Sequence, residues 1–365
     1  MSQETPHLFR PLTLGGLRIR NRAWVSPMCQ YSVEGRDGIP GDWHLVQYGG
    51  FAAGGFGLVM TEATAVNPDG RISPFDTGLW NDQQVVAWRW VTDFLRGQGA
   101  VSAVQLAHAG RKASTNRWWP GEPVGNVTAD QGGWTPVGPT ADKGDGPDFT
   151  SEVRALDEAG IQQVIDDFRS AAQRARDAGF DVVEVHAAHG YLLHQFYSPL
   201  SNTRQDQWGG SFTNRTRLVL AVVDAVREVW QGPLLVRISA TDWTDAGWGI
   251  EDSVELARLL KEHRVDLVDV SSGGLVNARI PVGPGYQVAF AEQIRREAGI
   301  PTSAVGLVTE PEQAEEILTE GQADAVMLAR QALREPAWPL RAAHRLGLPA
   351  EDAPWPSARW RGAWR

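Results

Sequence analysis

The sequence has little cysteine: Cys29 is the only one among 365 residues. One thiol cannot build an internal disulfide framework or hold an iron–sulfur cluster, so a reducing cytoplasm is the expected compartment. No stretch reaches about 18 uncharged apolar residues, which argues against a membrane span. The amino terminus is polar and lacks the apolar core of a signal peptide.

Basic residues are also too few for a typical nucleic-acid-binding protein. The net charge is −10 and the isoelectric point is near 5.3, whereas nucleic-acid-binding domains are usually basic. The chain contains no H-E-x-x-H motif and no G-x-G-x-x-G turn after its first predicted strand. The second absence makes an open, doubly wound sheet only the runner-up among the possible folds.

What the sequence does contain is an alternation of short apolar runs with amphipathic helical runs. The predicted strands are Arg22–Met28, Phe56–Ala63, Ala100–Ala107, Asp181–His186, Pro233–Ser239, Val265–Ser271, Pro301–Gly306 and Ala323–Ala329. The predicted helices are Gln83–Gln98, Asp157–Ala178, Asn214–Trp230, Glu251–His263, Tyr286–Ala298, Pro311–Glu320 and Gln331–Leu346. Parallel strands need helical crossovers and closure removes sheet edges, so this order predicts an α/β fold, a single-domain (β/α)8 or TIM barrel over residues 1–365.

Two segments exceed a minimal barrel. Residues 112–157, after the third strand, are rich in Gly, Pro, Trp and Asp and have no helical period. A loop of this length is usually functional, and we expect it to act as a lid. Residues 348–365 carry three tryptophans, which a disordered tail seldom does, so we expect this tail to dock on another surface.

The most informative stretch runs from Asp181 to Phe196. An apolar, β-branched strand leads directly into His186, His189 and Tyr191. In a barrel of parallel strands, active sites lie at the carboxyl ends. A metal site would need a third ligand, and a pair of satisfied core histidines is also possible. The nearby phenol favours a carbonyl-binding pair of imidazoles with a proton donor.

Polar residues recur at the carboxyl ends of the other predicted strands. Gln105 and Arg237 interrupt apolar strands, and such buried polar groups need partners. The ends of strands seven and eight are the usual phosphate site of this barrel, where Gly306 permits close approach and Arg330 offers paired donors. The carboxyl ends of the strands therefore predict a site for a large polar ligand that carries a phosphate.

The chain contains three long ordered motifs, which are His186-Ala-Ala-His189-Gly-Tyr191-Leu-Leu-His-Gln-Phe196, Ser198-Pro-Leu-Ser-Asn-Thr-Arg204 and Gly209-Gly-Ser-Phe-Thr-Asn-Arg215. These motifs resemble those of the old yellow enzyme family of flavin-dependent ene-reductases. Three others are similar to the thermophilic-like bacterial branch: Ser26-Pro-Met-Cys-Gln-Tyr31, Glu62-Ala-Thr64 and Gln105-Leu-Ala-His-Ala-Gly-Arg-Lys112.

The resemblance implies non-covalent FMN at the barrel mouth, reduced by NADPH or NADH. It implies the following flavin contacts: Ser26, Pro27, Met28 and Cys29 along the ring, Ala63 and Gln105 at its edge, Arg237 near the pyrimidine, and Gly306, Ala329 and Arg330 on the phosphate. It further implies that His186 and His189 bind the substrate carbonyl beside Tyr31, and that Tyr191 donates a proton. Cys29 would tune the flavin and would not act as a nucleophile.

By the same resemblance, the substrates are small enones or enals and the protein is a homodimer or homotetramer. Arg361, in the tail Trp360-Arg-Gly-Ala-Trp364, would reach the site of a neighbouring subunit. Two alternatives stay open at this point, a metal-dependent TIM-barrel hydrolase with His186 and His189 as ligands and a non-catalytic flavin-binding protein. A dienoyl-CoA-type reductase is disfavoured, because its larger members carry a cysteine-bound cluster and a second flavin domain, and this chain has neither the cysteines nor the length.

Overall fold

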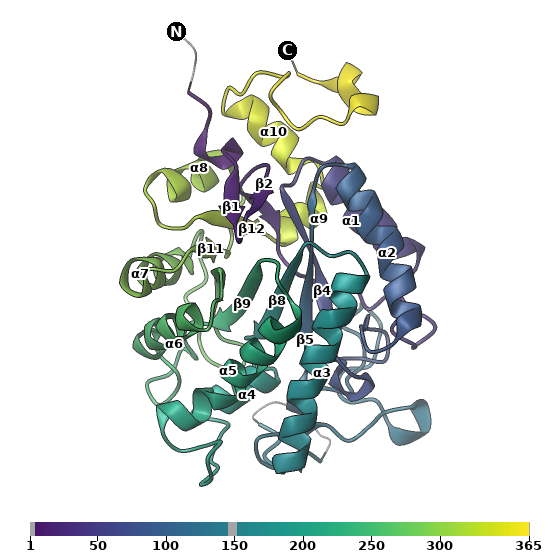
Figure 1. Ribbon diagram of the computed structural model, residues 1–365, viewed down its shortest axis with the longest axis vertical. Coiled ribbons are helices and arrows are strands. Elements are labelled where there is room, and N and C mark those ends of the chain that lie inside the picture. The colour runs from purple at the N-terminus through teal and green to yellow at the C-terminus, as the bar shows by residue number, and fades with distance from the viewer. Residues whose placement is uncertain (1–3, 145–151, 365) are drawn as a thin grey trace.

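The computed structural model describes residues 4–144 and 152–364 of the protein. Within these residues, parallel strands close into an eight-stranded barrel in which the last strand pairs with the first (Figure 1). In order around the barrel they are β3 Ala23–Val25, β4 Leu58–Ala65, β5 Val101–Ala107, β8 Val182–Ala187, β9 Leu234–Ser239, β10 Leu267–Ser271, β11 Thr302–Ala304 and β12 Ala325–Leu328. The predicted (β/α)8 barrel is confirmed, and every predicted run overlaps one of these strands.

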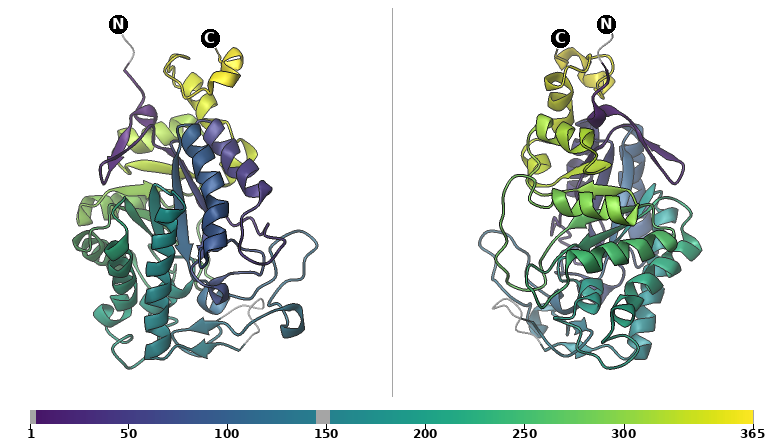
Figure 2. Two further views of the ribbon diagram at one scale, coloured as in Figure 1. Left: turned by 45° about the vertical axis from the view of Figure 1, so that its right-hand side comes forward. Right: turned by 90° about the vertical axis from the view of Figure 1, so that its left-hand side faces the viewer.

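Helices cover the outside of the barrel (Figures 1 and 2). They are α1 Asp42–Ala53, α2 Asp82–Gly97, α3 Glu158–Asp177, α4 Leu192–Tyr197, α5 Phe212–Val229, α6 Ile250–Glu262, α7 Val288–Ala298, α8 Pro311–Thr319, α9 Arg330–Arg334 and α10 Trp338–Arg345. No helix in the described part of the chain has the length and apolar character needed to cross a membrane. The single helix predicted over Gln331–Leu346 is wrong, because Pro336 lies between α9 and α10 and proline disrupts a helix interior. The sequence pattern does not indicate α4.

Local capping signals set where some of these helices begin. The Asn81 side chain accepts the Gln84 N–H at 3.1 Å, and the Gln84 side chain accepts the Asn81 N–H in return. Asp157 caps α3 by accepting the Gly160 N–H at 2.8 Å. Such caps satisfy N–H groups that the first helical turn leaves without partners. They anchor the start of two crossovers that keep neighbouring strands parallel.

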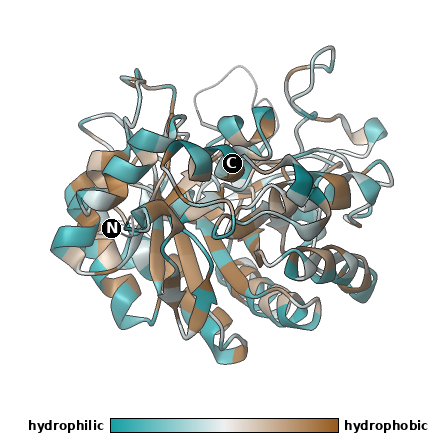
Figure 3. Ribbon diagram, turned by 90° about the horizontal axis from the view of Figure 1, so that it is seen from above, coloured by the Kyte–Doolittle hydropathy of each residue, from teal (hydrophilic) through white to brown (hydrophobic). Residues whose placement is uncertain are grey.

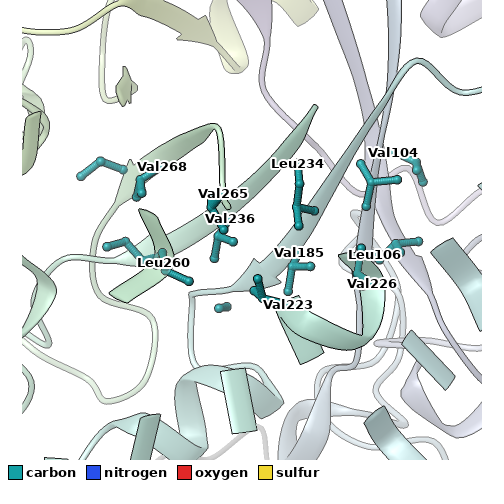
Figure 4. Close-up of a cluster of buried hydrophobic side chains, with 14 of the residues drawn as sticks. Val104, Leu106, Val185, Val223, Val226, Leu234, Val236, Leu260, Val265 and Val268 are labelled. Atoms are coloured by element: carbon teal, nitrogen blue, oxygen red, sulfur yellow. The ribbon is translucent and has the colours of Figure 1, made fainter. Parts of the chain in front are cut away.

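Successive side chains along each strand point alternately outward and inward, and this divides the core into an outer layer and a barrel interior. On β8, Val183 and Val185 pack outward against the helices, whereas Val182 faces the interior. The next two interior positions are Glu184 and His186, so the inward face changes from apolar to polar toward the carboxyl end. Figure 3 shows the largely hydrophobic strands, and Figure 4 shows valines and leucines of β5, β8, β9 and β10 in one cluster with residues of α5 and α6.

A hairpin that the sequence analysis does not predict closes the amino-terminal end of the barrel. Strands β1 Leu12–Leu14 and β2 Leu17–Ile19 pair antiparallel. Leu14 and Ile19 are buried in one cluster with Trp24 and the first interior residues of the other strands. Because this end is filled, the carboxyl end is the open mouth.

The long loop, residues 112–157, carries little regular structure in its described part. It contains the short parallel pair β6 Val137–Gly138 and β7 Arg154–Ala155 and one-turn 3-10 helices. Residues 145–151 of this loop lie outside the described residues. Its role as a lid stays a prediction.

The carboxyl-terminal tail folds against its own chain. The Trp364 ring stacks on His344 of α10 with centroids 5.4 Å apart, and Trp355 contacts Trp364 edge-on at 5.5 Å. Figures 1 and 2 show the tail next to α10 and near the amino terminus, at the end that the hairpin closes. The tail is therefore remote from the mouth of its own barrel.

We predict that the hairpin is a main contributor to stability. Ile19→Ala removes a fully buried side chain, and such changes destabilise proteins by about 2–5 kcal/mol. Thr13→Ala, on the exposed face of the same hairpin, is the matched control and should change stability by about 0.5 kcal/mol or less. Urea unfolding followed by circular dichroism measures both variants. Equal effects of the two changes would contradict a plugging role.

Candidate active site

The carboxyl ends of the strands open into a cavity of about 890 Å³, a volume that includes open solvent at its mouth. The predicted site residues that line it are Ser26, Pro27, Cys29, Ala63, Gln105, His186, His189, Tyr191, Arg237, Gly306, Ala329 and Arg330. Met28 and Tyr31 are not in the lining. Met28 packs against the hydrophobic core, and Tyr31 packs against the same small apolar cluster as Cys29 and Tyr191.

His186, His189 and Tyr191 form one group where β8 ends and α4 begins. The ring centroids of His186 and His189 are 5.3 Å apart, and those of His186 and Tyr191 are 5.0 Å apart, both edge to face. Ser271 Oγ lies 2.7 Å from His189 Nε2 and orients that ring. The structure thus brings together the three side chains that the sequence analysis singled out.

The side chains of His186, His189 and Tyr191 are hydrogen-bond donors that carry no net charge. Burial lowers the pKa of His186 and His189 well below 6.5, and the positive charges of Arg237 and Lys112 lower both pKa values further. Burial raises the pKa of Tyr191 well above its usual value, so the phenol keeps its proton. A neutral imidazole has one N–H donor and a phenol has one O–H donor. Such a group suits a carbonyl oxygen better than a cation.

Below the rim, the barrel interior holds a layer of paired polar side chains. Gln105 Nε2 donates to Glu184 Oε1 at 2.8 Å. Arg237 Nε lies 3.1 Å from Asp269 Oδ2, and Arg237 Nη1 donates to Ser26 Oγ at 3.0 Å. These contacts supply the partners that two polar residues inside apolar strands need. They also hold the guanidinium of Arg237 at the base of the cavity.

Glu184 and Asp269 share this layer with Arg237. Burial raises the pKa of Glu184 to about 8, with a further rise from Asp269 that Arg237 opposes. Burial also raises the pKa of Asp269. Glu184 Oε2 has no hydrogen-bond partner among residues 4–144 and 152–364. Glu184 is therefore largely protonated at neutral pH, and Asp269 is the direct partner of the Arg237 charge.

Cys29 lies in an environment that keeps its thiol neutral. Burial raises the pKa of Cys29 well above its usual value, and the carboxylates of Asp76 and Glu62 raise it further. Glu62 is held in place by the Gln30 N–H at 2.9 Å and the Tyr48 hydroxyl at 3.1 Å. Because the thiolate is the nucleophilic form, this setting disfavours covalent chemistry at Cys29.

The opposite end of the cavity is lined by Gly306 and Arg330. Gly306 has φ of +127°, a conformation that side chains with a Cβ rarely adopt. Arg334 and Tyr286 also line this end and are absent from the sequence-based prediction. Arg334 follows Arg330 by four residues and so shares one face of α9, which is the signal that could have identified it. No comparable pattern marks Tyr286.

The chain matches a known protein family over most of its length. Residues 7–349 match the NADH:flavin oxidoreductase / NADH oxidase family. The chain belongs to this family. An NADPH dehydrogenase of Listeria innocua is 48% identical over 356 residues, which cover 97% of this chain and 99% of the relative. An NADPH dehydrogenase of Geobacillus thermodenitrificans is 47% identical over 346 residues, covering 94% and 96%.

Solved structures of the old yellow enzyme type have the same fold. Morphinone reductase superposes with a TM-score of 0.78 at 32% identity, covering 96% of this chain and 92% of that chain. An old yellow enzyme homologue from Zymomonas mobilis gives a TM-score of 0.78 at 26% identity, covering 93% of each chain. The resemblance to the old yellow enzyme family is confirmed.

Membership of this flavin oxidoreductase family does not support the alternative function of a metal-dependent hydrolase. In the described residues, no group of three or more His, Cys, Asp or Glu side chains could hold a metal ion. His186 and His189 lie next to Tyr191 and Ser271, and neither of those residues is a typical partner in a catalytic metal site.

The raised pKa of Glu184 predicts a pH-dependent stability difference. Between the ordinary glutamate pKa of 4.5 and the folded-state pKa of about 8, the unfolded chain ionises this group whereas the folded chain keeps it protonated. Its contribution is therefore present below about pH 4.5 and is lost as the pH rises toward about 8. We expect Glu184→Gln to match the wild type near pH 5 and to exceed it near pH 8.5.

Urea unfolding across this pH range measures the difference between the two proteins. Glu351→Gln, at an exposed position, is the control and should show the same difference at every pH. A stability gap between Glu184→Gln and the wild type that does not vary with pH would show that Glu184 is ionised in the folded protein.

Proposed function

We propose that this protein is an FMN-dependent ene-reductase that uses NADPH or NADH to reduce the C=C bond of α,β-unsaturated carbonyl compounds. The observation that best supports this function is that two neutral imidazoles and the phenol of Tyr191 meet at the mouth of the cavity. Membership of a flavin oxidoreductase family and relatives named NADPH dehydrogenase support the cofactor and the reductant.

The chemistry of the cavity lining fits FMN. The cavity has cations toward one end, at Arg330 and Arg334, and the guanidinium of Arg237 at its base. We assign the phosphate to Gly306, Ala329 and Arg330, the polar edge of the ring to Gln105 and Arg237, and the remaining ring contacts to Ser26, Pro27, Cys29 and Ala63. Met28, which lies outside the lining, is left out of this assignment. The chemistry supplied by bound FMN is hydride acceptance from a nicotinamide and hydride donation to the alkene.

The side chains at the rim act on the substrate. His186 and His189 donate hydrogen bonds to the carbonyl oxygen, where negative charge grows as the alkene is reduced, and donors fixed in place stabilise that charge. Tyr191 transfers its phenolic proton to the α-carbon. Tyr31, which packs against the same apolar cluster as Tyr191, borders the substrate. Neutral imidazoles serve this role because each carries one N–H donor and burial disfavours its charged form.

Replacement of both histidines tests these roles. His186→Ala combined with His189→Ala should lower cyclohexenone reduction by a factor of about 10² to 10³ or more, because the loss of one such donor alone commonly costs this much. Tyr191→Phe should slow the same reaction by a factor of about 10² to 10⁴ through loss of the proton donor. Anaerobic single-turnover oxidation of the reduced enzyme by cyclohexenone measures both effects.

Ferricyanide oxidation of the same reduced enzymes is the control, because this oxidant needs neither the carbonyl site nor the proton donor. Its rate should be unchanged. Undiminished cyclohexenone reduction in the double-histidine variant would show the roles to be wrong. A wild-type protein that binds FMN and yet oxidises NADPH no faster when enone is added would instead be a non-catalytic flavin-binding protein.

We also propose that the protein is a homodimer or homotetramer. Helices α1 and α2 pack on each other and expose large apolar side chains, namely Trp43, Val46, Val86, Trp90 and Phe94, which are 40–67% exposed. An apolar patch of this kind often marks an association surface. The tail that carries Arg361 folds at the closed end of its own barrel (Figures 1 and 2). We therefore assign Arg361 to the site of a neighbouring subunit.

A charge placed in this patch should weaken the assembly. We expect Trp90→Glu to shift the protein toward monomer at micromolar concentration, because the carboxylate would lose its water at the interface. Light scattering coupled to size-exclusion chromatography measures the mass. Gln162→Glu, exposed on α3, adds the same charge elsewhere and should leave the mass unchanged. An unchanged mass for Trp90→Glu would place the interface on another face.

A further inference from the structure

The turn between His189 and Tyr191 has an unfavourable backbone conformation. His189 and Gly190 are consecutive left-handed residues, with φ of +57° and +71°. Gly190 adopts this region readily, and a Cβ there would come within 2.4 Å of Gly274 O. His189 has a Cβ and is disfavoured in this region. Its conformation must therefore be imposed by contacts from the surrounding structure.

Side chains from two other parts of the barrel hold the peptide groups of His189. The His189 N–H donates to Ser239 Oγ, at the end of β9, at 2.9 Å. The His189 carbonyl accepts from Lys112 Nζ at 2.9 Å, and Lys112 also donates to Gly274 O at 2.8 Å. The turn is thus joined to the loop after β5, to β9 and to the loop after β10.

Two side chains of α4 hold the peptide groups of Gly190. The Gly190 N–H donates to His194 Nδ1 at 2.9 Å, and the Gly190 carbonyl accepts from Gln195 Nε2 at 2.6 Å. Both backbone groups of each residue in the turn therefore have a side-chain partner. Turns more often rely on the backbone or on water for these partners.

The bond from Gly190 also decides the tautomer of His194. Because Nδ1 accepts a hydrogen bond from the Gly190 N–H, the neutral ring carries its proton on Nε2. That nitrogen lies 2.9 Å from Asp242 Oδ1. Asp242 Oδ2 accepts from Ser198 Oγ at 2.6 Å and from the Trp248 N–H at 2.9 Å. Burial opposes ionisation of Asp242, yet its bonds to His194 and Ser198 hold its pKa below the usual value.

We propose that His194 and Asp242 are positioning residues for proton delivery. Asp242 selects the tautomer in which His194 accepts the Gly190 N–H, and this bond sets the orientation of Tyr191 relative to His186 and His189. The inference rests on the proposed ene-reductase function. Neither residue lines the cavity, so both act through the turn rather than on the substrate.

Asp242→Asn tests the proposal because it alters the tautomer with almost no change in shape. The Trp248 N–H is a fixed donor, so the amide oxygen of Asn must stay on that side and its NH2 must face His194 Nε2. His194 then carries its proton on Nδ1, which points at the Gly190 N–H, and the bond to the turn is lost. A wrong tautomer of this origin is known to disable a catalytic histidine in serine proteases.

In the FMN-loaded enzyme, we expect Asp242→Asn to slow oxidation of the reduced protein by cyclohexenone about 10- to 100-fold, since small misplacements of reacting groups have effects of this size. Oxidation of the same reduced protein by ferricyanide should stay within about twofold of the wild-type rate, because that reaction needs no proton donor. Selective ¹⁵N labelling of histidine should show the His194 proton move from Nε2 to Nδ1.

His194→Asn provides a second variant and a double-mutant cycle. Its amide oxygen can occupy the place of Nδ1 and accept the Gly190 N–H without help from Asp242. Asp242→Asn should therefore cause no further loss in the His194→Asn background. Should Asp242→Asn not fold, His194→Phe removes the acceptor while keeping a ring, and it should show the same loss with cyclohexenone alone.

Trp248→Phe is the matched control for general loosening of this region. It removes a buried bond from Trp248 Nε1 to Ser253 Oγ at 2.6 Å and leaves the Trp248 N–H and Asp242 in place. This variant should lose stability and keep its cyclohexenone rate. An Asp242→Asn enzyme that switches tautomer yet keeps its cyclohexenone rate, or that loses both oxidation reactions equally, would overturn the proposal. A wild-type enzyme that does not reduce cyclohexenone would refute the proposed function itself.

Discussion

The desolvation of the side chains at the mouth of the barrel is the constraint on which the site depends. Burial keeps His186 and His189 uncharged and keeps Tyr191 protonated, so three side chains become neutral hydrogen-bond donors. In open solvent the same imidazoles would be partly charged near their ordinary pKa and would be surrounded by water. A low local dielectric also strengthens each hydrogen bond made to a substrate oxygen. Barrel closure is therefore part of the chemistry as well as of the fold.

Closure has to be reconciled with the burial of charge. The barrel interior separates charged from apolar groups in three layers. The first is the apolar cluster that contains Leu14 and Ile19, the second is the set of paired polar groups around Arg237, and the third is the rim. Two carboxyl groups next to one guanidinium would leave an excess negative charge in the interior. Retention of a proton on Glu184 removes that excess, and Arg237 keeps a single carboxylate partner.

The candidate site combines local and remote contributions. His186, His189 and Tyr191 are close in sequence, and the alternation of β8 followed by a turn is enough to bring them together, which is why they could be identified before the structure. The contacts that orient them come from Ser271 and from the network beyond α4, more than 40 residues away along the chain. No local sequence pattern identifies such partners, because a serine, histidine or aspartate becomes a partner of the site only when the fold brings it into contact.

By itself, the sequence determined the order of the barrel strands, the barrel they form and most of the polar residues at its mouth, because periodicity and the position of polar residues at strand ends are local properties of the chain. It misassigned the helix after β12, where Pro336 divides the pattern, and it contained no sign of the hairpin plug. Only the tertiary structure decided which groups are neutral, which nitrogen of His194 carries a proton and which backbone groups are held. Those properties depend on desolvation and on hydrogen bonds between segments far apart in sequence, and both arise only when the barrel closes.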